Sequence, residues 1–483
     1  MEELAPLAVQ AAKAAGADYA DARFVRQREE QVHVKNGAVT GLSASRSQGI
    51  GIRVIAGGAW GFAGTSNLDK RSVTEAAQLA VRIARASATT MKTALVLSEV
   101  ELVRARVGHT AQRDPFEVPL EQRIALLLEC DQAMHGAEQV KVRSGFLRCV
   151  GEEKLFVSSE GSEIWQERIE TGGGVDARAV SADGSDTQVR SYPSSHGGNM
   201  GSRGWEMIEE MELVDNAERV AGEAVELLEA PQCPSGVKDI ILEGSQLALQ
   251  VHESCGHPIE LDRVLGMEAG YAGTSFLTTE KLGNFRYGSD IVNFNSDATV
   301  PGGLGSFAYD DEGVPGQRTP IIEKGMFVGY LSSRETASQI GLKSSGAMRA
   351  DGYSRIPLVR MTNINLEPGD ATLQEIIEDT QDGLYLLTNT SWSIDDRRLN
   401  FQFGTQMAYE IKNGKLGQLL KNATYSGITP QFWQSCDAIG NRDEWLMWGV
   451  PNCGKGEPGQ TAHVGHGASC ARFRKVHVGV MKS

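Results

Sequence analysis

Residues 243–262 read EGSQLALQVHESCGHPIELD and predict a helix with one buried face that ends in a group of chemically active side chains. Leu247, Val251 and Cys255 recur at intervals of four residues, the spacing of apolar positions on one face of an α-helix. Ser245 precedes them and is a residue type that favours a helix N-cap. We therefore interpret this segment as a short helix that packs into a core.

The far end of the helix contains His252, Glu253 and His257 in the pattern His-Glu-x-x-x-His. This is one residue longer than the pattern of common zinc peptidases. Neutral imidazoles bind zinc, and a catalytic zinc site uses three protein ligands and leaves one position for water. A neighbouring carboxylate can take a proton from that water and pass it to the leaving amine. The pattern predicts a hydrolytic metal site, with surface or capping histidines as the alternative.

The spacing of the two histidines also predicts a distorted helix. Five residues of regular α-helix at about 100° each place His252 and His257 about 140° apart, too far to share one tetrahedral ion easily. A π-bulge would bring the rings closer, and Gly256 and Pro258 both favour leaving helical geometry. We expect the helix to be bulged or broken between Ser254 and Pro258, with His252 on its last regular turn.

A third ligand must come from elsewhere, because two histidines do not complete a zinc site. Cys255 and Glu260 are candidates within or just after the helix. A second source is residues 452–470, NCGKGEPGQTAHVGHGASC, which contain Cys453, His463, His466 and Cys470. Spacing alone does not choose among them.

Two other functions are weaker interpretations of the same C-terminal segment. Residues 449–456, GVPNCGKG, nearly match a phosphate-binding loop, but Gly456 stands where that loop needs a hydroxyl group for magnesium. Cysteine-nucleophile catalysis would need Cys453 or Cys470 beside one of the two histidines, His463 and His466.

The first half of the chain mixes hairpins and helices without strict βαβ order. The Asn36-Gly37 pair predicts a tight turn between two strands. An amphipathic helix follows, capped by Asn67 or Asp69. The glycine-rich residues 170–177, ETGGGVDA, lack a dinucleotide-binding context and are interpreted as a turn or a substrate-facing loop.

A domain boundary is expected after one long acidic helix from about Trp205 to Glu229. The next residues, APQCPSGV at 230–237, contain two prolines and a glycine and predict a linker. Beyond it the pattern favours turn-centred hairpins and short helices. We predict an α+β fold with an N-terminal mixed α+β domain at 1–230 and a β-rich, metal-bearing catalytic domain at 237–483.

Composition narrows the partners and the compartment. A net charge of −15 and a pI near 5.2 argue against a nucleic-acid or anionic-membrane partner, which would need a clustered positive surface. The N-terminus lacks the pattern of a secretory signal, and no apolar run approaches membrane-spanning length. Seven scattered cysteines suggest no disulfide framework. We expect a cytoplasmic protein with reduced cysteines.

Segments along the whole chain resemble the TldD/PmbA family of peptidases, historically called modulators of DNA gyrase. These segments are GIGIRVIAGGAWGFAGTSNL, VHESCGHPIELDRVLG, DDEGVPGQRTPIIEKGMFVGYL, MRADGYSRIPLVRMTNINLEPGD and NCGKGEPGQ. The resemblance implies that His252, His257 and Cys453 bind zinc and that Glu253 is the catalytic glutamate. The PmbA (TldE) branch lacks this metal motif, so the resemblance implies the active TldD-like branch.

The family resemblance also implies a dimer, either a homodimer or a heterodimer with a PmbA/TldE-like protein, that encloses the site. The predicted function is a zinc-dependent peptidase for short or unfolded peptides, with zinc-bound water as nucleophile and Glu253 as general base. The alternative is a non-enzymatic protein that matures peptides or modulates a topoisomerase, which the older family name suggests.

Overall fold

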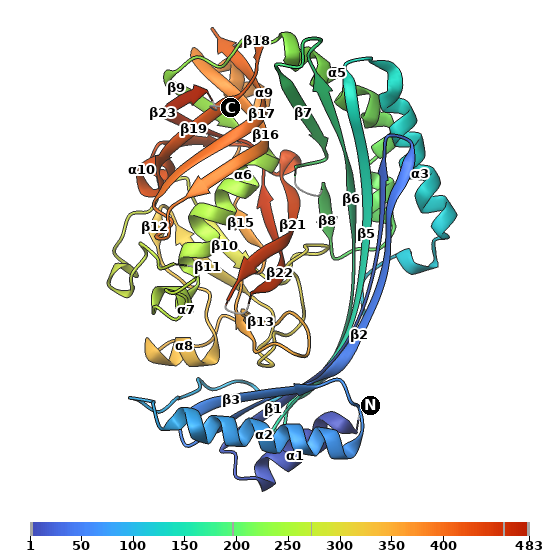
Figure 1. Cartoon of the computed structure of the whole chain (residues 1–483). Coiled ribbons are helices and arrows are strands. Elements are labelled where there is room, and N and C mark those ends of the chain that lie inside the picture. Colours follow the sequence, from blue (N-terminus) through green and yellow to red (C-terminus); the bar gives the residue numbers. More distant parts are fainter. Residues whose placement is uncertain (1–2, 196–197, 272, 457–458, 481–483) are drawn as a thin grey trace.

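The computed structural model describes residues 3–195, 198–271, 273–456 and 459–480. Its N-terminal half is built on one eight-stranded sheet, and its C-terminal half on a seven-stranded sheet with three smaller ones. Figure 1 shows the long strands of the first half curving past the more globular second half. Helices and strands are mixed in both halves, which confirms the predicted α+β fold class.

Four long antiparallel strands form the frame of the N-terminal half. They run in the order β2-β1-β5-β6, and the shorter β3 and β4 flank them while β7 and β8 pair with β6. Asn36 and Gly37 have positive φ values of 48° and 75°, as the predicted tight turn between β1 and β2 requires. The strands are β1 (Tyr19–Lys35), β2 (Ala38–Ala56), β3 (Ala59–Thr65), β4 (Arg104–Val107), β5 (Val140–Ser158), β6 (Glu163–Val180), β7 (Thr187–Tyr192) and β8 (Asn199–Gly201).

Helices cover the two ends of this sheet and create two separate cores. Near the chain's start, α1 and α2 pack on the sheet, and Asp69 caps α2 by accepting the Ser72 N–H at 2.9 Å, as one of the two expected caps. At the opposite end, α3 and α5 pack on the same long strands (Figure 1). The helices are α1 (Leu4–Ala14), α2 (Lys70–Ala88), η1 (Pro115–Glu117), α3 (Leu120–Ala133), η2 (Met134–Gly136), α4 (Glu206–Glu210) and α5 (Leu213–Glu229).

Two expectations for this half are wrong. The acidic helix is divided into α4 and α5, because Glu212 takes a left-handed conformation with φ 49°. This break lets Met211 and Leu213 both turn into the core. Residues 170–177 are also no turn: they lie within β6, where a Cβ at Gly172 would stand 2.1 Å from Met200 Cγ. The glycines are needed because β8 approaches β6 closely.

The main sheet of the C-terminal half closes on itself. Its order is β16-β9-β23-β19-β17-β18, β16 also pairs with β17, and β20 pairs with β23. The helix predicted from residues 243–262 packs into the core of this half, where Leu247, Val251 and Cys255 are all fully buried. The strands are β9 (Gly236–Leu242), β16 (Asp382–Ile394), β17 (Asn400–Lys412), β18 (Lys415–Leu420), β19 (Ala423–Ile428), β20 (Cys436–Ile439) and β23 (Ala471–Val480).

Smaller sheets and short helices complete this half. The sheets are β12-β11-β10-β15, β13-β14 and the hairpin β21-β22. Their strands are β10 (Phe294–Asp297), β11 (Arg318–Glu323), β12 (Met326–Phe327), β13 (Met348–Arg349), β14 (Leu358–Val359), β15 (Ile364–Leu366), β21 (Leu446–Lys455) and β22 (Gln460–Ala468). The helices are α6 (Gly244–Val251), η3 (His252–Gly256), η4 (His257–Ile259), α7 (Leu261–Val264), η5 (Thr279–Lys281), α8 (Arg334–Gln339), α9 (Leu373–Glu378), α10 (Thr429–Gln434) and η6 (Arg442–Glu444).

Two sequence features bear on the chain's surroundings. All seven cysteines are free and buried, as expected without a disulfide framework. Within the described residues, no helix is both long and apolar enough to cross a membrane.

Candidate metal centre

The predicted distortion of the motif helix is confirmed as a π-helix. Regular α6 ends at Val251, η3 (His252–Gly256) is a π-helix, and a 3₁₀ turn follows at His257. The distortion begins at His252, two residues earlier than expected. The wider turn brings the rings of His252 and His257 to a centroid separation of 4.8 Å. Gly256 leaves room here for Met361, whose Sδ would stand 2.4 Å from a Cβ at this position.

Cys453 approaches the two histidines from the β21–β22 hairpin. Its Sγ lies 3.8 Å from His257 Nε2, and one ligand atom from each of His252, His257 and Cys453 lies within 4.8 Å of the others. All three side chains are buried. The ligand atoms of a tetrahedral zinc site stand about 3.3–3.8 Å apart, given the usual zinc–nitrogen and zinc–sulfur distances. The three residues therefore fit a zinc ion with little movement.

The protonation states of these side chains also suit a metal. Burial lowers the pKa of His252 and lowers that of His257 well below the usual value, so both rings are neutral and keep a lone pair. Burial alone would raise the pKa of the Cys453 thiol, but the nearby Arg360 guanidinium counteracts burial and the pKa lies below its usual value. Neutral imidazoles and a thiolate are a donor set typical of zinc.

Glu260 orients His257. His257 Nδ1 lies 3.0 Å from Glu260 Oε2, so the ring donates to the carboxylate and turns Nε2 toward Cys453. Lys455 Nζ lies 3.4 Å from the other carboxylate oxygen, so a cation stands beside this buried side chain. Such a carboxylate–histidine pair commonly fixes the ring of a metal ligand. Glu260, considered above as a ligand, thus contacts the candidate ligand His257 from behind.

His466 orients His252, as Glu260 orients His257. His466 Nδ1 lies 3.3 Å from the Ile364 carbonyl oxygen and must donate to it, because a carbonyl only accepts. Its Nε2 therefore accepts from His252 Nδ1 at 2.8 Å, and burial and the neighbouring His252 keep the pKa of His466 well below its usual value. The remaining nitrogen of His252, Nε2, is left with its lone pair for a metal.

Glu253 is buried next to the ligands and is paired with a cation. Arg398 Nη1 lies 2.5 Å from Glu253 Oε2. Glu253 and the three ligand residues line one cavity of about 300 Å³. Arg398 was not anticipated, since it lies 145 residues away on a turn and nothing in its local sequence marks it.

The other sequence candidates lie apart from this cluster. Burial raises the pKa of Cys255, which is enclosed in the hydrophobic core. His463 pairs with Glu170. Cys470, whose pKa burial raises to about 12, lies 3.6 Å from a Glu444 carboxylate oxygen. No cysteine–histidine nucleophile pair is therefore assembled from these residues.

The near match to a phosphate-binding loop is likewise no such loop. Residues 449–455 lie in strand β21, and the buried Lys455 Nζ donates to Asp262 and to the Val359 carbonyl oxygen, each at 2.7 Å. Because these two hydrogen bonds hold the ammonium group of Lys455 inside the fold, it is not available to bind a phosphate.

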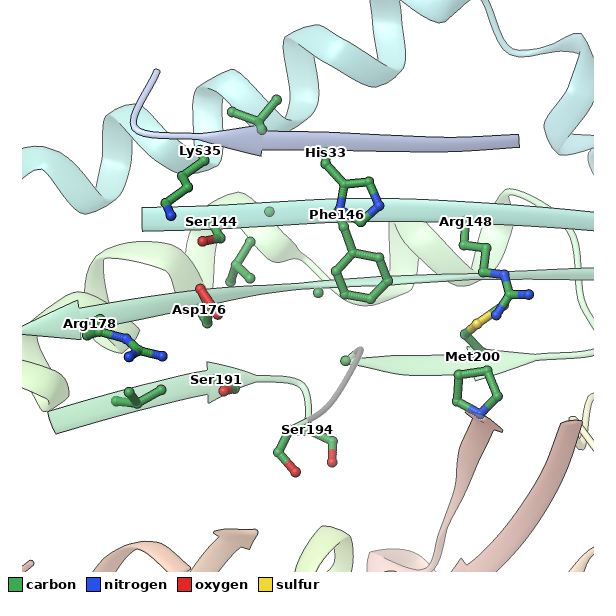
Figure 2. Close-up of a pocket in the computed structure, with 18 of the residues that line it drawn as sticks. His33, Lys35, Ser144, Phe146, Arg148, Asp176, Arg178, Ser191, Ser194 and Met200 are labelled. Carbon is green, nitrogen blue, oxygen red and sulfur yellow. The ribbon is translucent and has the colours of Figure 1, made fainter. Parts of the chain in front are cut away.

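A larger groove of about 710 Å³ adjoins the metal-centre cavity. Figure 2 shows side chains from neighbouring long strands facing it, including Lys35, Phe146, Asp176 and Arg178. Five residues line both spaces and mark the passage between them: Ser194, Ser195, Asn389, Pro451 and Asn452. The groove therefore leads to the buried ligands along the concave side of the N-terminal sheet.

Comparisons with known proteins show which family the chain belongs to. Three family models match in succession: PmbA/TldA metallopeptidase domain 1 at residues 20–84, the central domain at 113–230 and the C-terminal domain at 235–479. A metalloprotease of Methanocaldococcus jannaschii is 31% identical over 465 residues, covering 94% of this chain and 96% of the relative. A zinc metalloprotease TldD homolog of Saccharolobus solfataricus is 30% identical over 246 residues, covering 51% and 52%.

Solved structures share the fold. A Thermotoga maritima protein whose name refers to modulation of a DNA gyrase has a TM-score of 0.78 at 18% identity, covering 99% of this chain and 100% of that one. TldE from Thermococcus kodakarensis has a TM-score of 0.69 at 17% identity, covering 97% and 98%. Together with the family models and the metalloprotease relative that matches along nearly the whole length, these findings establish that the chain belongs to the PmbA/TldD family of metallopeptidases.

Proposed function

We propose that this metallopeptidase is zinc-dependent, with His252, His257 and Cys453 as the zinc ligands and Glu253 as the general base. The observation that carries the proposal is the convergence of the three buried ligand atoms to within 4.8 Å of one another, with Glu253 lining the same cavity. The name of the Saccharolobus solfataricus relative supports zinc in particular.

A zinc ion held here would supply a Lewis acid and lower the pKa of a water molecule toward 7. Residues of the chain orient the imidazoles and transfer the proton. His466 and Glu260 hold the two imidazoles in the tautomers that leave Nε2 free. Glu253 takes a proton from water and returns it to the leaving nitrogen of the peptide.

The proposed substrates are short or unfolded peptides. The ligands are buried at the end of a cavity of about 300 Å³, which is reached here through the adjoining groove. A peptide in extended form fits such a passage, whereas a folded domain does not. We further propose that a dimer, with a second copy or with a TldE-like partner, encloses the groove; the similarity of this fold to TldE supports such a pairing.

Elemental analysis combined with a cleavage assay tests the proposal. We expect about one zinc per chain and cleavage of an unfolded, alkylated protein that a chelator abolishes and added zinc restores. The same protein in its native fold is the matched control and should resist cleavage. Equal rates on both forms would contradict the access argument. Peptide binding without cleavage, unaffected by the chelator, would favour the non-enzymatic alternative.

A further inference from the structure

Arg398 is the one Lys or Arg among the described residues that line the metal-centre cavity. Its Nη1 donates to Glu253, while its buried Nε has no hydrogen-bond partner in the described part of the chain. An arginine side chain offers five N–H donors in a fixed, planar arrangement. Buried donors are nearly always satisfied, so an unsatisfied one beside a catalytic carboxylate needs an explanation. The Arg398 side chain is 17% exposed and lines the cavity, so a ligand held there can accept a hydrogen bond from its guanidinium group.

The backbone holds Arg398 in a conformation that arginine disfavours. Its φ is 64°, in the left-handed region, where a Cβ crowds the following carbonyl oxygen. The turn between β16 and β17 enforces this: Arg398 N donates to the Asp395 carbonyl oxygen at 2.8 Å, and Thr429 Oγ1 donates to the Arg398 carbonyl oxygen at 2.9 Å. Non-glycine residues held in this way concentrate at functional sites.

Three other side-chain donors of the cavity are either engaged in hydrogen bonds or far from the histidines of the motif. Ser245 Oγ donates to Glu243, and the Asn389 amide donates to two backbone carbonyl oxygens. The buried Trp448 Nε1 lacks a partner but lies against Gly244, about 12 Å along the helix from the first histidine of the motif. The Arg398 guanidinium, in contrast, lies beside the proposed base and has an N–H group, at Nε, without a hydrogen-bond partner in the described part of the chain.

We propose that Arg398 binds the carbonyl oxygen of the scissile peptide bond and stabilises the negative charge that develops on it. This inference rests on the proposed function. Water oxygen forms a bond to the carbonyl carbon, a water proton moves to Glu253, and the π electron pair of the carbonyl moves onto the oxygen held by Arg398. The pair then returns, the carbon–nitrogen bond breaks, and Glu253 delivers the proton to the leaving nitrogen. Donors placed for such an oxyanion act mainly on the transition state.

The test compares Arg398→Gly, Arg398→Lys and the exposed neighbour Arg397→Gly as a matched control. Glycine accepts the left-handed backbone, so Arg398→Gly removes the guanidinium without adding strain. We expect kcat on a short unstructured peptide to fall by ~10²–10³-fold, with KM within about 3-fold of wild type. Arg398→Lys should recover part of the loss, and Arg397→Gly should match wild type. Zinc content should stay unchanged in all three, and thermal unfolding of Arg398→Gly measures what the loss of the ion pair with Glu253 does to stability.

Calorimetry with a phosphinic tripeptide gives a readout that does not depend on turnover. Its phosphinic group is tetrahedral and anionic, like the centre that forms when water attacks the peptide carbonyl. Arg398→Gly should therefore bind it ~10²-fold more weakly than wild type. Wild-type affinity and kcat in Arg398→Gly would overturn the inference while leaving the peptidase assignment intact. A raised KM with unchanged kcat would also overturn it, since the arginine would then bind the ground state. A wild-type protein without zinc or cleavage would remove the proposed function, and the inference with it.

Discussion

His466 Nε2 accepts a hydrogen bond from His252 Nδ1, and His466 in turn donates to the Ile364 carbonyl oxygen. The imidazole of His466 and a backbone carbonyl thereby fix the orientation of His252, one of the proposed zinc ligands. We expect His466→Ala to weaken zinc binding by ~10–100-fold, the usual effect of losing such a partner, as measured by competition with a chromogenic chelator. His477→Ala, at an exposed position of β23, is the control. Unchanged affinity in His466→Ala would show that His252 needs no support.

The choice of the third ligand predicts different outcomes for two buried cysteines. Cys453→Ser should lose most bound zinc, because it removes the thiolate that lies 3.8 Å from His257 Nε2. Cys255→Ser should keep its zinc and lose only stability, by about 1–3 kcal/mol, because it places a hydroxyl in an apolar core. Elemental analysis and chemical denaturation of both variants measure the two effects. The reverse pattern would transfer the ligand role to Cys255.

The proposed base can be separated from metal binding. Glu253→Gln is nearly isosteric but cannot take a proton, so we expect it to bind zinc normally and to lose ~10²–10⁴-fold in peptide hydrolysis. Glu323→Gln, on the exposed end of β11, should behave as wild type in the same assay. Hydrolysis by Glu253→Gln at the wild-type rate would exclude this residue as the base.

The buried histidines predict how the stability of the zinc-free protein depends on pH. The pKa values of His252, His257 and His466 are all lowered from 6.5, chiefly by burial, so the unfolded chain binds more protons than the folded one below that pH. The stability that comes from keeping these three rings neutral is fully present above pH 6.5 and is lost as the pH falls below it. The melting temperature of the chelator-treated protein should therefore drop between pH 6.5 and 5.5. His466→Gln, with one titrating ring fewer, should show a smaller drop, and a flat profile would contradict the burial effect.

Local patterns predicted much of the fold. Turn chemistry at Asn36-Gly37 and the amphipathic helix capped by Asp69 are short-range features, and the structure confirms both. The break at Glu212 is different, because the surrounding sequence is compatible with a continuous helix and only the shape of the core requires the bend. The role of the glycines at 172–174 also depends on tertiary structure, because the strand that lies against them, β8 (Asn199–Gly201), is not adjacent to them in the sequence.

The candidate site also combines features that the local sequence predicts with features that only tertiary structure determines. The motif spacing alone predicted a distorted helix, because His252 and His257 cannot face one ion from a regular one. Cys453 was suggested by family resemblance rather than by spacing, and the structure brings it next to both histidines. Arg398 could not be found in this way, since it lies on the turn between β16 and β17 and meets Glu253 of η3 across 145 residues of sequence. The roles of these residues stay predictions until the variants are measured.

The pairing of β9 with β23 has a consequence for the chain while it is being synthesised. β9 leads directly into the helix that carries His252 and His257, yet its partner strand begins at Ala471, where Leu242 pairs with it. Domains fold as the ribosome releases them, amino end first. A nascent chain therefore exposes the two histidines long before Cys453 emerges, and it lacks the strand that closes the sheet around them. We therefore expect the candidate site to be completed only near the end of translation, once Cys453 and β23 have been made.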